Sequence, residues 1–244
     1  MSIYIIAHKN FDVPVSDEFY KVLQVGTDIN GVINDSWCMD NTGDNISEKN
    51  LSYNELTGLY WIWKNTSEDV VGLCHYRRYF VTHIGKMKNL LFGRKQGYID
   101  REHVDKVLLD KDMIVHNKTY FKQGCKKQYL QTQKYPEDIN ILREVLINKY
   151  PEYVEAYDEV MTGKKCHLLN MIITRRDTLN RYCEWLFDIL NEIESILISK
   201  GEKSFERRLG MLGERMLDIW IVANNINIKE VYSINTERKD WKAW

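Results

Sequence analysis

The chain has 244 residues, with 34 Lys and Arg against 35 Asp and Glu and a formal net charge of −1. With 44% hydrophobic residues, 28% charged residues, 3 Pro and 13 Gly, its composition excludes disordered, collagen-like and low-complexity chains. The near-zero charge excludes a general nucleic-acid binder, which needs a basic surface. We expect one domain over residues 1–244, since single α/β domains often reach this length.

The charge is unevenly distributed along the chain. Between His75 and Lys127 there are 13 Lys or Arg and 5 Asp or Glu, which leaves the remainder acidic. A cationic segment in an acidic protein indicates an anionic ligand or surface, and the alternative is a solvated, Lys-rich face. Beyond the residues assigned below to a diphosphate, the excess predicts peripheral contact with an anionic membrane surface.

The sequence predicts a cytoplasmic protein, with any membrane contact at the inner face. The apolar stretch 3–7 is too short for a secretion signal, and no apolar run approaches the ~18 residues that span a bilayer. The five cysteines are scattered and contain no CxxC pair, which favours reduced thiols over a disulfide framework or a zinc site.

The predicted elements of the first half begin with a buried strand at residues 3–7. The turn-rich residues 40–45 predict a loop, and Ser52 to Glu55 are typical of a capping box that opens a helix reaching about residue 65. A second buried strand at residues 70–74 leads directly into His75, Tyr76, Arg77 and Arg78.

The second half continues the alternation of helices and strands. We expect a short helix near residues 104–108, a strand at 113–116, and two helices on either side of 149–151. After them we expect a strand at 167–174, a long helix capped by Asp177, a helix from about Glu214 to Asn224, and a strand at 231–234. This order predicts an α/β fold with a mostly parallel sheet flanked by helices.

Three predicted strand ends carry polar side chains, where ligands bind in open α/β sheets. His8 and Lys9 follow the first strand, and Asn170 lies within the fourth. After the second strand, two consecutive arginines bring fixed cations to the sheet edge. An arginine fork matches phosphate oxygens, which suits a diphosphate leaving group. The alternative is that Arg77 or Arg78 pairs with a carboxylate at the edge of the core.

The sequence contains no P-loop, GxGxxG, GxSxG or HExxH motif. A literal DxD occurs at Asp110 to Asp112, the pattern by which many nucleotide-sugar transferases hold a metal. It precedes a predicted strand instead of following one, so we interpret it as a helix-to-strand turn.

Acidic residues supply the candidate base. Glu214 is placed at the start of a predicted helix, where the macrodipole lowers the pKa of a carboxylate, and an ionised carboxylate beside Arg215 suits a general base. The alternative is a surface glutamate that only complements the dipole. Glu55 is equally consistent with capping and with a ligand role. Asp40 and Asp44 could accept hydrogen bonds from sugar hydroxyls or simply shape a turn.

Two strings are highly distinctive: DNTGDNIS, which begins at Asp40, and CHYRRYF, which begins at Cys74. Together with residues 3–9, 55–65, 170–172 and 213–215, they resemble a bacterial family of capsular and exopolysaccharide biosynthesis glycosyltransferases, first described as a domain of unknown function. The resemblance covers nearly the whole chain. It implies a GT-A-like domain that binds a nucleotide sugar.

The resemblance also implies a reaction. A hexose would pass from a UDP-sugar, with UDP-galactofuranose among the donors to consider, to a lipid-diphosphate-linked saccharide in capsule, exopolysaccharide or O-antigen synthesis. The alternative is a non-catalytic nucleotide-sugar or carbohydrate-binding subunit of a polysaccharide-synthesis complex. Where GT-A enzymes carry DxD after a strand, this chain has Cys74 to Arg77. We therefore expect no metal held in the usual DxD manner, while Mn²⁺ or Mg²⁺ bound in another way stays open.

Catalytic roles follow from the resemblance for three residues. Arg77 and His75, with Arg78, would stabilise the departing UDP, the step at which charge develops and preorganised cations help most. Glu214 would act as the base or as a stabiliser of the transition state.

Binding roles follow for residues that would contact the donor or the acceptor. These are His8 and Lys9 near the nucleotide; Asp40, Asp44 and Asn45 near the donor sugar or ribose; and Asn170 at the donor or acceptor hydroxyls.

Overall fold

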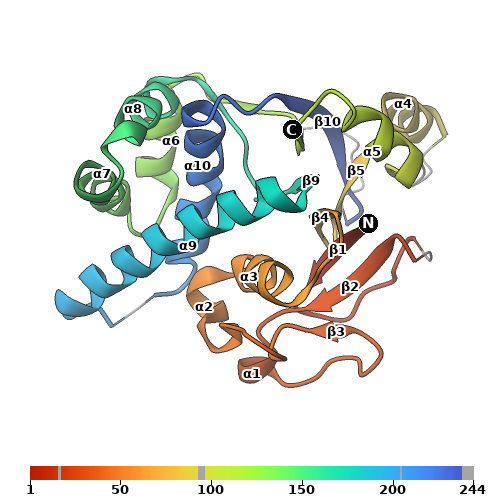
Figure 1. Ribbon diagram of the computed structural model, residues 1–244, viewed down its shortest axis with the longest axis horizontal. Coiled ribbons are helices and arrows are strands. Elements are labelled where there is room, and N and C mark those ends of the chain that lie inside the picture. Colours follow the sequence, from red (N-terminus) through yellow and green to blue (C-terminus); the bar gives the residue numbers. More distant parts are fainter. Residues whose placement is uncertain (16–17, 93–96, 204, 238–244) are drawn as a thin grey trace.

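The computed structural model describes residues 1–15, 18–92, 97–203 and 205–237, and the side chains of residues 89–92 are not described. Arg94 and Lys95, which belong to the cationic segment, lie outside these residues. Strands and helices alternate in an α/β fold (Figure 1). None of the described helices has both the length and the apolar character needed to cross a bilayer.

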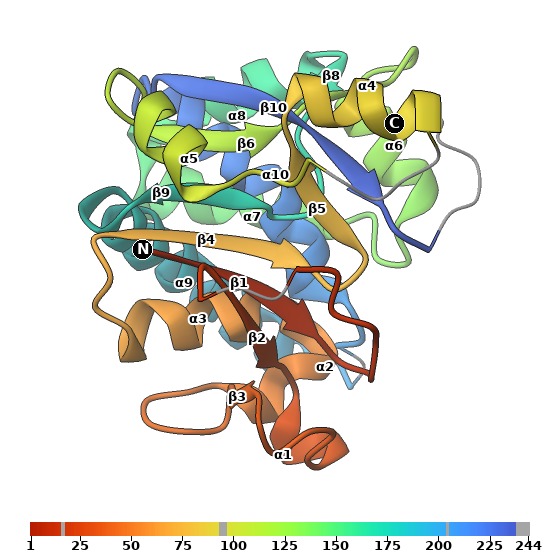
Figure 2. The same ribbon diagram turned by 90° about the vertical axis from the view of Figure 1, so that its right-hand side faces the viewer.

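One half of the large sheet is parallel. Its strands are β3 (Cys38–Met39), β2 (Tyr20–Gln24), β1 (Ser2–Ala7) and β4 (Val70–His75), each parallel to its neighbour. All six residues of β1 are buried, as its apolar sequence predicts. The carboxyl ends of β1 and β4 therefore lie at one edge of the sheet (Figure 2).

The other half of the sheet is mixed, so the expectation of a mostly parallel sheet is wrong. Strand β9 (Ile172–Arg175) is antiparallel to β4 and to β6 (Met113–His116), and β10 (Ile228–Asn235) is parallel to β6 but antiparallel to β5 (Arg78–Val81). Only two residues join β4 to β5, whereas a parallel crossover needs a dozen or so. Strands β7 (Thr119–Tyr120) and β8 (Lys165–Cys166) form a separate antiparallel pair.

Helices cover the sheet and pack against one another beside it (Figure 1). Near the parallel half lie α1 (Thr27–Asn30), the 3₁₀ helix η1 (Ser47–Lys49), α2 (Asn50–Tyr53) and α3 (Leu56–Asn65). The remaining helices are α4 (His83–Phe92), α5 (Arg101–Val107), α6 (Cys125–Thr132), α7 (Asp138–Lys149), η2 (Pro151–Tyr153), α8 (Val154–Thr162), α9 (Arg176–Ser199) and α10 (Arg208–Ala223).

Three predicted helix starts are wrong. Helix α10 begins at Arg208, so Glu214 is its seventh residue and lies well inside it. Ser52 belongs to α2, and no side chain caps the start of α3, so Ser52 to Glu55 do not form a capping box. Asp177 likewise lies within α9, which begins without a side-chain cap.

The strand predicted at residues 167–174 is shorter than expected. Strand β9 covers only its end, and residues 167–171, which we call the β8–β9 segment, are irregular. Leu169 and Asn170 have φ angles of 76° and 50°. These are left-handed values that a strand cannot accommodate.

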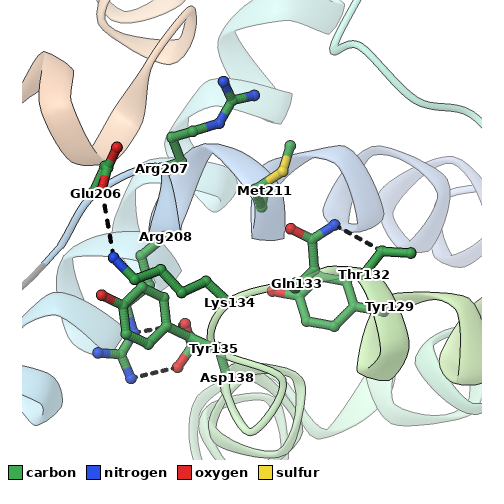
Figure 3. Close-up of a pocket in the computed structure, with 10 residues that line it drawn as sticks. All are labelled: Tyr129, Thr132, Gln133, Lys134, Tyr135, Asp138, Glu206, Arg207, Arg208 and Met211. Atoms are coloured by element: carbon green, nitrogen blue, oxygen red, sulfur yellow. Dashed lines mark hydrogen bonds and ion pairs between the residues drawn. The ribbon is translucent and has the colours of Figure 1, made fainter.

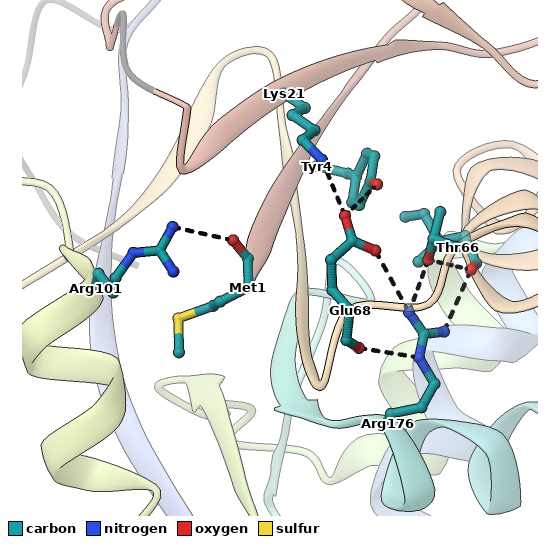
Figure 4. Close-up of polar contacts among 8 residues, drawn as sticks. Met1, Tyr4, Lys21, Thr66, Glu68, Arg101 and Arg176 are labelled. Carbon is teal, nitrogen blue, oxygen red and sulfur yellow. Dashed lines mark hydrogen bonds and ion pairs between the residues drawn. The ribbon is translucent and has the colours of Figure 1, made fainter.

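A polar cluster around Glu68 closes the opposite edge of the sheet (Figure 4). Its carboxylate accepts hydrogen bonds from Tyr4 Oη and Lys21 Nζ, both at 3.0 Å, and its carbonyl oxygen accepts one from Arg176 Nε at 3.2 Å. These contacts tie β1, β2, the start of β4 and α9 together, away from the edge that carries the predicted site.

Candidate functional site

The β8–β9 segment forms the centre of the candidate site because α10 holds its backbone. Asp218 Oδ2 accepts a hydrogen bond from the backbone N–H of His167 at 2.7 Å, and Glu214 Oε1 accepts one from the N–H of Leu169 at 3.0 Å. Glu214 and Asp218 are four residues apart and so lie on one face of α10. Left-handed backbone in a residue other than glycine persists only where surrounding contacts enforce it, as they do here.

Two side chains reach this segment from other elements. His75, at the end of β4, donates from Nε2 to the carbonyl oxygen of Leu169 at 2.6 Å. Asn170 donates from Nδ2 to Oε1 of Glu55, just before α3, at 2.7 Å. The structure thus brings together three predicted site residues, His75, Asn170 and Glu214, with Glu55.

His75 is neutral at pH 7. Burial lowers its pKa to about 4, and the charges of Arg78 and Arg77 oppose protonation further. Because a carbonyl oxygen accepts the bond from Nε2, we assign the proton to that nitrogen. His75 therefore supplies no cation for a diphosphate and instead fixes the β8–β9 segment.

Glu55 and Glu214 form a pair of carboxyl groups with raised pKa values. Burial raises the pKa of Glu214 to about 7, and the negative charge of Glu55 adds to the effect. Burial also raises the pKa of Glu55, against the hydrogen bond from Asn170. The predicted lowering at Glu214 is therefore wrong, because this residue lies inside a helix and is partly buried. A carboxyl group that titrates near pH 7 can exchange a proton with a substrate hydroxyl.

Cations lie beside this pair at the ends of β1 and β4. Glu237, which follows β10, accepts hydrogen bonds from Lys9 Nζ at 2.9 Å and Arg77 Nη1 at 3.4 Å. All three side chains are 40–50% exposed, so these ion pairs are weak and exchangeable. Arg78 is half-buried, and its charge acts against the burial that raises the pKa of Glu55.

Aromatic rings flank the cations. Tyr76 makes edge-to-face contacts with His8 and Phe11 at centroid distances of 5.1 and 5.8 Å, and Phe11 lies 5.5 Å from Trp37. Lys9 Nζ lies 4.9 Å from the centre of the Tyr76 ring. Phe11 and Trp37 were not expected at this site, and the position of Phe11 shortly after a strand end is the one signal in the sequence that indicates it.

The structure does not bring Asp40 to this cluster. Its carboxylate is fully buried and accepts hydrogen bonds from the backbone N–H groups of Gly26 and Thr27 at 2.9 and 3.1 Å and from the hydroxyls of Ser47 and Thr57 at 2.6 and 2.7 Å. With four donors satisfied, Asp40 fixes α1, η1 and α3 relative to one another.

Asp44 and Asn45 also lie apart from the cluster. Asp44 accepts a hydrogen bond from the Tyr60 hydroxyl at 3.0 Å, and its backbone brackets the side chain of Asn65, at the far end of α3 from Glu55. Asn45 bonds within the loop, to Gly43 and Ser47. The DNTGDNIS string thus shapes a loop in this structure.

The DxD string forms the predicted turn between α5 and β6, and Asp112 Oδ2 accepts a hydrogen bond from the backbone N–H of Asn227 at 2.9 Å. Within the described part of the chain, no three His, Cys, Asp or Glu side chains are grouped as metal ligands.

A pocket of about 350 Å³ opens beside the start of α10 (Figure 3). Its lining comes from α6, the residues that follow it, and the beginnings of α7 and α10, and comprises Tyr129, Thr132, Gln133, Lys134, Tyr135, Asp138, Glu206, Arg207, Arg208 and Met211. Arg208 forms a buried, bidentate ion pair with Asp138, with both distances 2.7 Å.

Comparison with known proteins places the chain in a family. No curated protein matches it. It is similar to the apo structure of a protein described as the WbbM bifunctional glycosyltransferase, with a TM-score of 0.80 and 26% sequence identity. The similarity covers 97% of this chain but 45% of the other, so the chain spans less than half the length of that protein. Residues 2–225 match the family described as "Domain of unknown function (DUF4422)", and the chain belongs to that family.

Proposed function

We propose that the chain is a glycosyltransferase that moves a hexose from a UDP-sugar to a lipid-linked saccharide in the synthesis of capsular polysaccharide, exopolysaccharide or O-antigen. UDP-galactofuranose is one donor to test. The observation that carries the proposal is the carboxyl pair of Glu55 and Glu214, in which the pKa of Glu214 is about 7, beside exposed cations at the carboxyl ends of β1 and β4. The similarity to a structure described as a bifunctional glycosyltransferase supports it.

The donor site is built from the cations and the rings. An arginine fork and a lysine neutralise phosphate oxygens, so Arg77 and Lys9 suit the diphosphate once Glu237 is displaced. Phe11 and Trp37 are partly exposed beside them and suit stacking on a planar base. The diphosphate and the base would then lie along the ends of β1 and β4.

The chemistry assigns distinct steps to distinct groups. The bond between the anomeric carbon and the diphosphate oxygen breaks, and its electrons leave with UDP, whose growing charge Arg77 and Lys9 offset. The acceptor oxygen forms the new bond to that carbon, and its proton passes to Glu214. His75 and Asn170 position the segment between the two carboxyl groups.

Metal dependence belongs to the same proposal. His75, Tyr76 and Arg77 stand where a DxD motif would place two carboxylates, so the cations take over part of the neutralisation. The purified protein should therefore release UDP from a UDP-sugar panel in EDTA. Loss of release in EDTA with recovery in Mn²⁺ would overturn this part of the proposal.

The catalytic test uses Arg77→Ala. Losing one preorganised donor costs about 2–4 kcal/mol of transition-state stabilisation, or about 30- to 1000-fold in kcat. Arg143→Ala is the matched control, because Arg143 is also a half-exposed arginine paired with a carboxylate, Asp158, but lies on α7. A near-normal kcat for Arg77→Ala would contradict the role. Binding of UDP without any turnover by the wild type would favour a non-catalytic binding subunit instead.

The proposed setting is the cytoplasmic face of a membrane, where a lipid-linked acceptor is presented. Part of the cationic excess has a structural partner, since Lys118 Nζ lies 3.5 Å from Asp218 Oδ1. Lys122, Lys126 and Lys127 are exposed and suit an anionic surface. Equal binding to neutral vesicles and to vesicles containing anionic lipid at low salt would contradict this contact.

A further inference from the structure

The pocket beside α10 has the size and lining of a small-molecule site. At about 350 Å³ it falls at the lower end of the range for such sites. The ring of Tyr135, the amide of Gln133 and the hydroxyl of Thr132 line it, together with Lys134 and Glu206 (Figure 3). Amides and hydroxyls both donate and accept hydrogen bonds, which matches the hydroxyl groups of a sugar.

Part of the pocket wall is held in place before any ligand binds. Arg208 is 2% exposed and is held by Asp138 through two bonds and by Glu202 at 3.1 Å. The ring of Tyr135 lies 4.3 Å from the Arg208 guanidinium carbon. A bidentate, buried ion pair fixes the relative positions of α7 and α10. A preformed wall lowers the entropy cost of binding a small ligand.

The pocket lies next to the carboxyl pair. Met211 lines it, and Glu214 follows one turn later on the same face of α10. Arg207 also lines the pocket, and its positive charge acts against the burial that raises the pKa values of both Glu214 and Glu55. Glu214 in turn acts on the pocket wall: burial raises the pKa of Tyr129 first, and the charge of Glu214 contributes to the same shift.

Arg207 links the pocket to the donor side. Its charge also lowers the pKa of His8, after burial and the charges of Lys9 and Arg77. Its side chain is exposed and forms no ion pair with any residue that the structure describes. Arg207 therefore lines the pocket while its charge also acts on the donor side, and its guanidinium is available to a ligand.

We infer that this pocket binds the saccharide acceptor and presents a hydroxyl group to Glu214. The inference rests on the proposed function, because it assigns the second substrate of the same reaction. The donor would approach from the ends of β1 and β4, and the acceptor from α6 and the start of α10, so that the two meet at the carboxyl pair.

The test is to fill the pocket. Gln133→Trp adds a large side chain at the lining, and Gln131→Trp is the matched control, since Gln131 is exposed two residues away and does not line the pocket. Binding of octyl glycosides of glucose, galactose, mannose and N-acetylglucosamine is measured by calorimetry, and binding of UDP is measured in parallel. Gln133→Ala, which removes the amide without adding volume, serves if the tryptophan variant does not fold.

We expect at least one octyl glycoside to bind the wild type and Gln131→Trp with equal affinity. Gln133→Trp should weaken that binding at least tenfold, and Gln133→Ala a few-fold, with UDP affinity unchanged in both. Equal glycoside binding by all variants, or no glycoside binding by the wild type, would overturn it. A loss of UDP binding confined to Gln133→Trp would assign the pocket to the nucleotide instead. Failure of the wild type to bind or turn over any UDP-sugar would overturn the proposed function and the acceptor role with it, and glycoside binding lost in Gln133→Trp would then assign the pocket to a saccharide ligand alone.

Discussion

The carboxyl pair predicts a specific dependence of the reaction on pH. If Glu214 must be ionised to accept the proton, its pKa of about 7 leaves it half ionised at pH 7 and about one-tenth ionised at pH 6. The rate should therefore fall about fivefold from pH 7 to pH 6 and rise at most about twofold above pH 7. Glu214→Gln should lower kcat and remove this dependence, with little change in the affinity for UDP.

Glu55→Gln tests the electrostatic reasoning itself. A glutamine can still accept the hydrogen bond from Asn170 but carries no charge. The charge of Glu55 is the second cause of the raised pKa of Glu214, after burial, so its removal should lower the midpoint by about one unit or less. A shift of one pKa unit, equivalent to about 1.4 kcal/mol of interaction between the two carboxyl groups, would make the rate at pH 6 about half maximal.

The assay is the pH profile of transfer, together with a carboxyl ¹³C titration of labelled protein that does not depend on activity. Glu184→Gln is the matched control, because Glu184 is an exposed glutamate on α9 away from the pair. A midpoint near pH 7 that persists in Glu214→Gln would show that another group titrates. An unchanged midpoint in Glu55→Gln would refute the coupling between the two carboxyl groups.

Three further predictions concern contacts around the site and the sheet. Glu237→Ala should strengthen UDP binding about two- to fivefold, since it frees Lys9 and Arg77 from exposed ion pairs of modest strength; calorimetry that finds weaker binding would contradict their assignment to the diphosphate. Asp40→Asn should lower the free energy of unfolding by about 3 kcal/mol in urea, because an amide cannot accept all four bonds, whereas a comparable loss in Asp44→Asn would count against this explanation. Burial opposes ionisation of Glu68, but hydrogen bonds led by that from Lys21 lower its pKa to about 2. The ionised carboxylate therefore contributes fully to the free energy of unfolding above pH 4.5, and this contribution is lost as the pH falls through 2. Glu68→Gln should lower the free energy of unfolding by about 2 kcal/mol at pH 7 and by much less near pH 2. An equal loss at both pH values would refute the explanation by ionisation of Glu68.

The sequence predicts best those elements whose side chains repeat a local pattern. The buried run of β1, the strand β6 at Met113–His116 and the helix that ends at Gly163 were all expected from periodicity and turn residues. Strand β5 was not expected at all, because it follows β4 after only two residues, in a stretch that the sequence presents as the polar end of a single strand.

Some residues of the candidate site could be selected from the sequence, but their protonation could not. The sequence singled out His75 and Glu214, and the structure joins both to the β8–β9 segment. Their protonation was not predictable, because burial by distant segments decides it. Helix α10 begins six residues before Glu214, which takes this residue away from the dipole, and burial lowers the pKa of His75 to about 4 although the bond to the Leu169 carbonyl acts in the opposite direction.

The β8–β9 segment explains why the two carboxyl groups meet at all. Glu55 precedes α3 and Glu214 lies in α10, and no local sequence pattern around either residue predicts that the two meet. Asn170 donates to Glu55, and the neighbouring residue Leu169 donates to Glu214, so two consecutive residues bridge the pair. That bridge requires the left-handed backbone at both residues, which costs of order 1–3 kcal/mol for each and is offset by contacts from β4 and α10. The strained backbone of these two residues therefore ties Glu55 and Glu214 to one segment, where burial first and the charge of Glu55 second raise the pKa of Glu214 to about 7.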